Sequence, residues 1–210
     1  MRLLSRPLIP ALLLSGLYPF AAIADPGVLD RWGCHNDAIT GEYHCHGDQA
    51  RASLGGIAVG VGLRSATWFY MGEGTLNLFT GPSIDVEAGL GAFALQASYH
   101  YKVLVNSNDE ITLSGWDVGA KVGRSVARYG YKLYGAGGYF YESLQRPDES
   151  NYGLSGFYVG IGTGYNWESY AVDVHLDWHS PAGYEQFWDD QNEPADIQAF
   201  SLRTVFSYRF

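Results

Sequence analysis

Apolar residues alternate with polar or small residues over most of the chain beyond position 54. In the first such stretch, Ile57, Val59, Val61 and Leu63 take every second position and share one face of a strand. Seven further stretches repeat this period-two pattern. The eight stretches cover residues 57–64, 84–90, 93–103, 116–122, 131–141, 157–165, 170–179 and 200–210. The pattern predicts an all-β fold, an antiparallel barrel of eight strands.

The polar faces of these stretches carry charges of both signs, whereas the apolar faces carry tyrosine and tryptophan near the strand ends. An outer-membrane barrel turns its apolar face to lipid and encloses a polar interior, while a soluble barrel does the reverse. We therefore expect a transmembrane barrel, with a soluble barrel as the alternative.

An eight-stranded barrel has room inside only for its own side chains, and charges buried there must pair. The predicted lumen network comprises Arg64, Asp85, Glu87, Lys102, Asp117, Lys121, Asp173, His175, Asp177, His179 and Arg203, with Lys132 and Arg209 beside it. The sequence thus predicts a salt-bridged plug and no open pore, although the inward glycines leave room for a narrow water path.

The connections between the stretches alternate in length. Short ones fall near Gly91, 124–128 and 166–169, and long ones near 71–82, 105–110, 143–153 and 180–196. Short periplasmic turns with long outer loops are typical of outer-membrane barrels. The long connections hold the single basic residue Arg146 and the acids Glu73, Asp109, Glu110, Asp148, Glu149, Glu185, Asp189, Asp190, Glu193 and Asp196. These acids either bridge to lipopolysaccharide through divalent cations or only keep the surface solvated.

The chain closes on Phe210, with Phe206 and Tyr208 on the same strand face. This ending resembles the terminal signal that the barrel assembly machinery reads in bacterial outer-membrane proteins. The whole region 54–210 resembles the small eight-stranded barrels of the OmpA and OmpX type. The resemblance implies a location in the cell outer membrane, lipid and lipopolysaccharide as neighbours, and a monomer. It implies architecture and not function.

Composition argues against several other classes of protein. Of the 210 residues, 27 are glycine, 15% are aromatic and only 17% are charged, which is the reverse of a disordered composition. The mean hydropathy of −0.11 argues against a bundle of membrane helices. The net charge of −9 argues against a nucleic-acid partner.

The first 24 residues have the layout of a secretory signal peptide. Arg2 and Arg6 form a basic head, an apolar stretch continues to Phe20, and 22–24 supply small residues for cleavage. A membrane anchor is the alternative, which the prolines of this stretch disfavour. We expect three parts: residues 1–24 as signal peptide, 25–53 as a short periplasmic segment, and 54–210 as the barrel.

The periplasmic segment holds both cysteines, Cys34 and Cys45, and three of the six histidines, His35, His44 and His46. A hairpin around 38–41 would place the cysteines opposite each other on one face and the imidazoles on the other. In an exported chain the cysteines favour a disulfide, and the histidines favour a zinc or copper site. A metal site that uses both thiolates, free thiols, and a disulfide-locked spacer with incidental histidines are the alternatives.

The segment also resembles a short GCH-N/D-x-x-TG-x-YHCH motif of secreted bacterial proteins. The matching residues are Gly33, Cys34, His35, Thr40, Gly41, Tyr43, His44, Cys45 and His46. The match covers less than a tenth of the chain and carries no biochemical role with it.

A catalytic role has one set of candidates. A lipid-modifying hydrolase of the lipid A deacylase kind needs a serine, a histidine and an acid near the outer leaflet. His179, Ser180 and Glu185 are in that region, but neighbouring residues of a strand point to opposite faces. We therefore expect no enzymatic activity and keep the hydrolase as the alternative.

Overall fold

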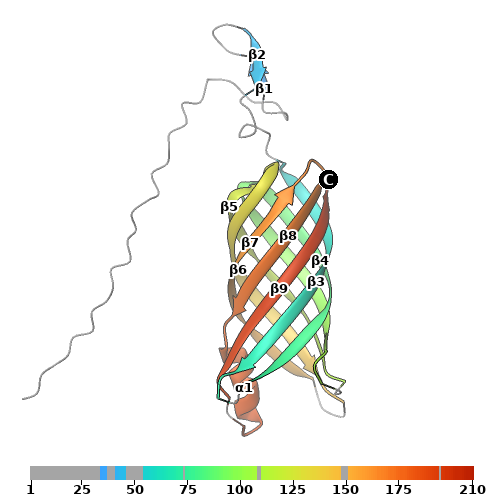
Figure 1. Ribbon diagram of the computed structural model, residues 1–210, viewed down its shortest axis with the longest axis vertical. Coiled ribbons are helices and arrows are strands. Elements are labelled where there is room, and N and C mark those ends of the chain that lie inside the picture. Colours follow the sequence, from blue (N-terminus) through green and yellow to red (C-terminus); the bar gives the residue numbers. More distant parts are fainter. Residues whose placement is uncertain are drawn as a thin grey trace, which may run out of the picture.

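A closed barrel of antiparallel strands dominates the computed structural model (Figure 1). The structure describes residues 34–36, 41–45, 54–72, 74–107, 110–147, 151–193 and 195–210. Within these, the barrel strands are β3 (Gly56–Tyr70), β4 (Thr75–Leu104), β5 (Thr112–Ala127), β6 (Gly130–Gln145), β7 (Tyr152–Asn166), β8 (Tyr170–His179) and β9 (Ile197–Arg209). Each strand pairs with the next, and β3 pairs with β9 to close the ring.

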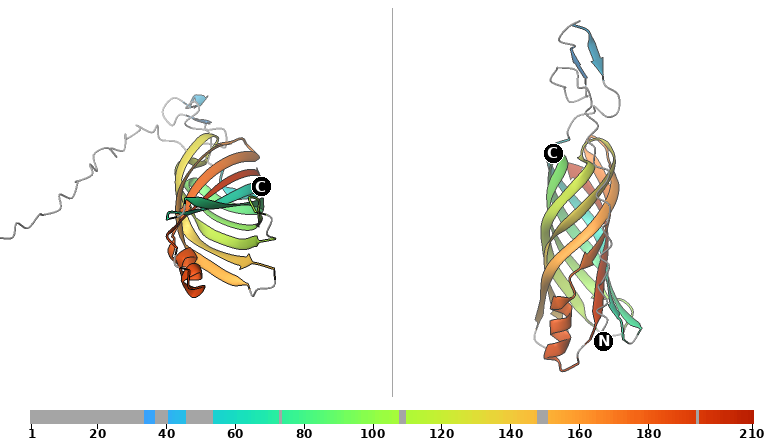
Figure 2. Two further views of the ribbon diagram at one scale, coloured as in Figure 1. Left: turned by 60° about the horizontal axis from the view of Figure 1, so that its bottom comes forward. Right: turned by 90° about the vertical axis from the view of Figure 1, so that its left-hand side faces the viewer.

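Two smaller elements complete the described part of the chain. A two-stranded hairpin, β1 (Cys34–Asn36) and β2 (Tyr43–Cys45), precedes the barrel. One helix, α1 (Ala182–Asp190), lies at one end of the barrel, as both views of Figure 2 show. Among the described residues, no helix is both long and apolar enough to cross a membrane. The signal peptide predicted at 1–24 lies outside the described residues.

The two faces of the barrel wall have opposite character. Ile57, Val61 and Ile161 are 54%, 65% and 65% exposed on the outer face. Arg64 and Lys102 are 2% and 0% exposed on the inner face. The apolar side chains thus face outward, as expected for lipid contact and opposite to a soluble barrel.

The strand count differs from the prediction within β4. Residues 75–89 pair with β3, whereas residues 91–103 pair with β5. A Cβ added to Gly81 would collide with the backbone of Tyr101, so the two halves of β4 lie side by side. Gly91, with φ of +65°, allows the chain to reverse without an unpaired segment. The described part of the structure therefore has seven continuous barrel strands, whereas the sequence pattern predicts eight.

The predicted long connection at 71–82 is wrong. β3 extends to Tyr70 and β4 begins at Thr75, so only four residues join them. The sequence Gly81-Pro82 indicates a turn, but both residues pair with β3 within the ladder. Gly81 is needed there because the strand backbones approach too closely for a side chain.

Of the other long connections, 146–151 is shorter than the predicted 143–153 because β6 and β7 extend further, whereas 105–111 and 180–196 match the predicted ranges to within one residue. The connections at 105–111, 146–151 and 180–196 share one end of the barrel with 71–74, and we call it the loop end. α1 lies within 180–196, a region that the pattern analysis treats as loop. The opposite end, the turn end, holds Gly91, the connections at 128–129 and 167–169, and Phe210, whose backbone N–H donates to the Ile57 carbonyl at 2.9 Å.

Candidate functional site

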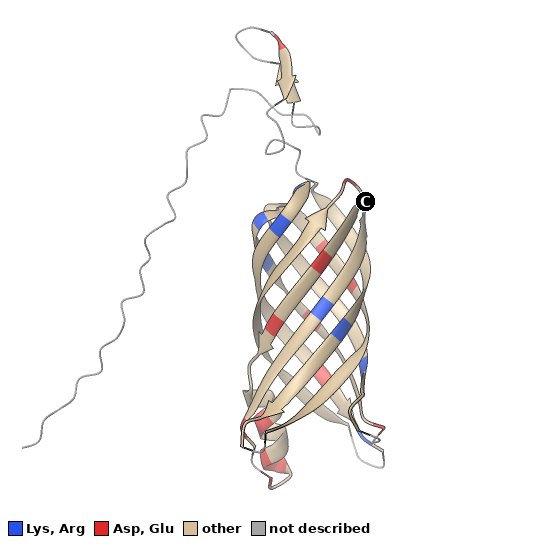
Figure 3. Ribbon diagram, in the orientation of Figure 1, with Lys and Arg blue, Asp and Glu red and all other residues tan. Residues whose placement is uncertain are grey.

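Charged side chains from every barrel strand except β7 meet inside the barrel, and Figure 3 shows both signs along its height. At mid-height, Arg64 Nη1 donates to Asp117 Oδ2 at 2.5 Å, and its Nη2 donates to Ser98 Oγ at 2.8 Å. Arg203 Nη1 donates to Asp85 Oδ1 at 2.8 Å and lies 3.6 Å from Asp117 Oδ1. Two arginines and two aspartates from β3, β4, β5 and β9 thus form one network across the lumen.

A second group lies nearer the loop end. Lys102 Nζ lies 2.6 Å from Glu142 Oε1, and neither side chain is exposed. His100 Nε2 lies 3.0 Å from the same oxygen. Gly115 of β5 lies between these residues in the ladder, and a Cβ there would meet Glu142 Cγ at 3.0 Å. The missing side chain lets groups on β4 and β6 meet across β5.

A third group lies nearer the turn end. Lys132 Nζ donates to Asp173 Oδ2 at 2.6 Å, and Tyr134 Oη donates to the other oxygen at 2.7 Å. Lys121 Nζ donates to Glu87 Oε2 at 2.7 Å. Each carboxylate of this group therefore has a cationic partner, as burial requires.

Aromatic rings fill the space that the inward glycines leave. A Cβ on Gly162 would collide with the Tyr134 ring, and one on Gly119 would collide with the Tyr158 hydroxyl. The pocket that Gln96 and Arg203 help to line at mid-height has a volume of about 20 Å³, room for about one water molecule. At these two positions the missing side chains thus accommodate rings from neighbouring strands.

The loop end is closed by an aromatic cluster built on α1. Tyr184 and Phe187 of α1 are each 2% exposed and belong to one apolar core with Trp68, Phe79 and residues of the strand ends. Tyr184 Oη also donates to Glu142 Oε2 at 3.3 Å. Burial raises the pKa of Tyr184 well above its ordinary value.

The two lumen histidines of β8 have specific neighbours. His175 Nδ1 lies 3.4 Å from Asp177 Oδ1 and 3.3 Å from Arg203 Nη2. His179 contacts no aspartate in this way: its ring nitrogens lie 3.1 Å from Tyr184 Oη and 3.2 Å from Ser201 Oγ. Of these two histidines, only His175 therefore contacts an aspartate of its own strand.

The candidate catalytic residues are engaged elsewhere. Both His179 nitrogens have the partners just given, and Ser180 Oγ accepts a hydrogen bond from the Phe157 backbone at 3.1 Å. Glu185 lies in the first turn of α1. This arrangement does not resemble a serine–histidine pair, and the absence of enzymatic activity stays a prediction.

Several residues of the lumen escaped the sequence analysis. Glu142, which joins Lys102 and His100, is absent from the predicted network, as are the ring fillers Tyr134 and Tyr158. The signal was present, because the alternation on β6 continues past Tyr141 and places Glu142 inward. The sequence analysis ended the strand at Tyr141 and placed a loop from residue 143, so Glu142 was left out of the network.

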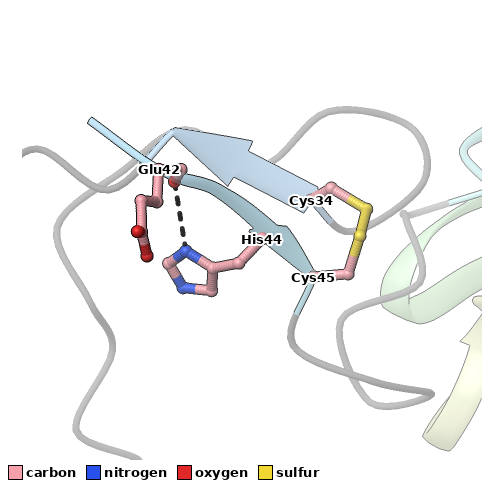
Figure 4. Close-up of a disulfide and its surroundings, with 4 residues drawn as sticks. All are labelled: Cys34, Glu42, His44 and Cys45. Atoms are coloured by element: carbon pink, nitrogen blue, oxygen red, sulfur yellow. Dashed lines mark hydrogen bonds between the residues drawn. A yellow bond between two sulfur atoms is a disulfide. The ribbon is translucent and has the colours of Figure 1, made fainter. Parts of the chain in front are cut away.

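The β1–β2 hairpin has the predicted register, with Cys34 opposite Cys45 and His35 opposite His44. The two sulfurs form a disulfide, shown in Figure 4. A site that uses both thiolates is therefore excluded in this state, since the sulfurs are bonded to each other. The imidazole centroids of the two histidines lie 4.7 Å apart.

The His44 ring contacts the backbone just before its own strand. Its Nδ1 lies 3.3 Å from the carbonyl oxygen of Glu42, a contact that favours a proton on Nδ1 and leaves Nε2 as the possible ligand atom (Figure 4). His46 lies outside the described residues. Within the described ranges, no group of three or more histidine, cysteine, aspartate and glutamate residues is arranged to hold a metal ion.

Comparisons with known proteins identify the fold. No protein-family model and no curated protein sequence matches the chain. Among solved structures, Ail, the attachment invasion locus protein of Yersinia pestis, matches with a TM-score of 0.51 and 13% identity over 74% of this chain and 99% of that one. Ail in complex with the heparin analogue sucrose octasulfate matches with a TM-score of 0.50 and 14% identity, over the same 74% and 99%. Neisserial surface protein A (NspA) matches with a TM-score of 0.54 and 11% identity over 73% and 97%. The chain therefore has the fold of the outer-membrane β-barrels.

Proposed function

We propose that this chain is an integral outer-membrane barrel that does not conduct and whose role is structural or binding rather than catalytic. The observation that carries the proposal is the filled lumen. Cationic and anionic side chains from strand segments that are not paired with each other meet at 2.5–2.8 Å, and aromatic rings occupy the space beside the inward glycines. Breaking these contacts to admit ions would leave buried charges unpaired, which costs several kcal/mol each.

We further infer that β4 acts as two membrane-spanning strands. A closed ring in which every neighbour is antiparallel needs an even number of passes, and seven would leave one parallel pair. The two halves of β4 pair with different neighbours and lie against each other around Gly91. Counted as passes, the wall then has the eight of the OmpA and OmpX type.

The two ends differ in a way that supports an orientation. The turn end holds the short connections and the aromatic C-terminus, so we assign it to the periplasm, together with the β1–β2 hairpin. The loop end carries Glu185, Asp189, Asp190, Glu193 and Asp196, which makes lipopolysaccharide, bridged by divalent cations, the proposed neighbour there. The same acids argue against a polyanion such as the heparin analogue bound by Ail. We also propose that the barrel assembly machinery inserts this chain into the membrane and that the barrel is a monomer.

Cell fractionation and gel mobility test the membrane assignment. We expect the protein in the outer-membrane fraction, released only by detergent, with a gel mobility that shifts when the folded sample is heated. Recovery of the native protein from the soluble periplasmic fraction would contradict the proposal.

A zinc or copper site in the hairpin is a second candidate function. The supporting observation is the placement of His35 and His44 side by side, with the His44 Nδ1 held by a backbone carbonyl. His46, two residues beyond His44, would supply the third imidazole. Because only neutral imidazole binds metal, affinity should fall as the pH drops through about 6.5.

Metal titration of the full protein, with its disulfide intact, tests this site. We expect binding of zinc or copper that is lost in His35→Ala and His44→Ala, while Asn36→Ala in the same hairpin retains it. Binding that appears only after reduction would contradict the imidazole site and indicate thiolate ligands instead.

A further inference from the structure

One charged side chain of the barrel strands lies on the outer face. The charged residues of β3–β9 are buried or partly buried, except Arg124, which is exposed on the face of β5 that also carries Val118 and Val122. Its partner in the ladder is Leu133 of β6, an exposed apolar residue. The cost of an arginine on the lipid face is highest at the bilayer midplane and small at the interface. Arg124 lies three residues before β5 ends at the turn end, so we place it at the level of the lipid headgroups.

A second arginine lies in the turn that follows β5. Arg128 is exposed, and its backbone N–H donates to the Ser125 carbonyl at 3.3 Å. Asn166 holds this turn in place, because its amide donates to three backbone carbonyls of residues 125–128 at 2.9–3.0 Å. A Cβ added to Gly91 would lie 3.8 Å from Arg128 Nη2, so the guanidinium lies beside the reversal of β4. One fixed corner of the turn end thus carries both cations.

The positive charge of this corner is not compensated within the described part of the chain. Neither the Arg124 nor the Arg128 guanidinium has a hydrogen-bond or ion-pair partner among the described residues. The adjacent connection 167–169 holds one acid, Glu168, which is exposed and forms no ion pair with either of them. In the lumen, by contrast, Arg203 Nη1 lies 2.8 Å from the Asp85 carboxylate. The corner therefore attracts an anion from outside the barrel.

Aromatic side chains surround the same corner. Tyr131, the next outward residue of β6 beyond Leu133, is 59% exposed. The Tyr165 ring lies 5.9 Å from the Tyr129 ring and 4.8 Å from the Trp167 ring, between centroids. Tyrosine and tryptophan are typical of the level at which hydrocarbon meets headgroups. Apolar wall on one side and cations on the other match the two parts of a phospholipid.

We propose that Arg124 and Arg128 bind the phosphate of an anionic phospholipid in the periplasmic leaflet. A guanidinium carries its N–H donors in one plane and donates two of them to the oxygens of one phosphate. The acyl chains pack against Val122 and Leu133. Charge selects an anionic headgroup, because a zwitterionic one brings an ammonium group to a corner that is already cationic. The inference rests on the proposed function in one respect: the turn end must face the periplasm, since the opposite leaflet would supply the phosphates of lipid A instead.

Native mass spectrometry of the full, folded protein tests this site. The protein is held in a nonionic detergent and titrated separately with phosphatidylglycerol, which is anionic, with phosphatidylethanolamine, which is zwitterionic, and with lipid A. We expect phosphatidylglycerol to bind about fivefold more tightly than phosphatidylethanolamine. Arg124→Gln and Arg128→Gln should each weaken the binding of phosphatidylglycerol about fivefold, the loss expected for one basic residue at an anionic membrane surface.

Arg146→Gln removes the same charge at the loop end and is the matched control, so it should bind phosphatidylglycerol as the unchanged protein does. Equal affinities for the two phospholipids, or an unchanged affinity in either Arg124→Gln or Arg128→Gln, would overturn the proposal. Tighter binding of lipid A that Arg124→Gln removes would also overturn it and would place the turn end in the other leaflet. A heat-modifiable band from the same sample shows that the barrel is folded, so a missing lipid preference is distinguishable from a failure of the membrane assignment.

Discussion

Replacing one partner of the deepest ion pair should destabilise the barrel strongly. Lys102 and Glu142 lie 2.6 Å apart with both side chains fully buried. Lys102→Met keeps the length of the side chain but leaves the Glu142 carboxylate without its cation. His100 and the Tyr184 hydroxyl remain within 3.0 and 3.3 Å of that carboxylate and offset part of the loss. Removing one partner of a buried pair costs about 3–5 kcal/mol, so we expect a loss of about 3 kcal/mol.

Urea unfolding in lipid vesicles, followed by tryptophan fluorescence, measures the free energy of unfolding. The double variant Lys102→Met with Glu142→Leu removes both charges together, and it should recover most of the lost stability because no ion stays unpaired. Val103→Met, on the lipid face of the same strand, is the control and should change stability by less than about 1 kcal/mol. A single Lys102→Met variant as stable as this control would refute the dry, paired lumen and indicate that water solvates Glu142.

Three further predictions concern packing, a turn and pH. Gly162→Ala should lose about 1–3 kcal/mol of unfolding free energy because its Cβ would collide with the Tyr134 ring, whereas Gly72→Ala, in open space, should not; matched urea titrations check both. Asn166→Leu should lose about 1–3 kcal/mol and slow refolding into vesicles, because the Asn166 amide donates to three backbone carbonyls at the turn between β5 and β6. Because burial raises the pKa of Tyr184, the packing of α1 should keep its full stability below the ordinary tyrosine pKa of 10.0 and weaken as the pH rises above it. Near-ultraviolet circular dichroism against pH checks this, and a Tyr184→Phe variant that weakens over the same range would contradict it.

The inside-out character of the barrel could be predicted because a period of two fixes which face each residue occupies. Arg64 and Val61 are an odd number of positions apart, so their side chains point to opposite faces of the strand. The same alternation places charged residues inside and apolar residues outside along the whole strand. The ends of the strands were harder to predict, since Gly81 and Pro82 are residues typical of a turn but pair with β3 within the sheet. The helix α1 was missed because it is held by the burial of Tyr184 and Phe187 in the barrel mouth, a tertiary effect.

The members of the lumen network could be predicted better than its pairs. Alternation places Asp117 and Arg64 inside, but it does not show that they meet across the lumen at the same height. That height depends on the stagger of the strands, which the sequence pattern leaves open. The disulfide and the register of the β1–β2 hairpin are local, eleven residues apart, so spacing and the exported context favour them, although the same residues also allow a thiolate metal site or free thiols.

Conductance across a planar lipid bilayer tests the central claim, a lumen closed by paired charges, most directly. The full protein is refolded, checked for its heat-dependent gel mobility, and recorded in salt on both sides of the bilayer. The account predicts no stable conductance steps above the bare bilayer. Reproducible ohmic steps from the unsubstituted protein would contradict it, because ions would then pass the level of Arg64 and Asp117.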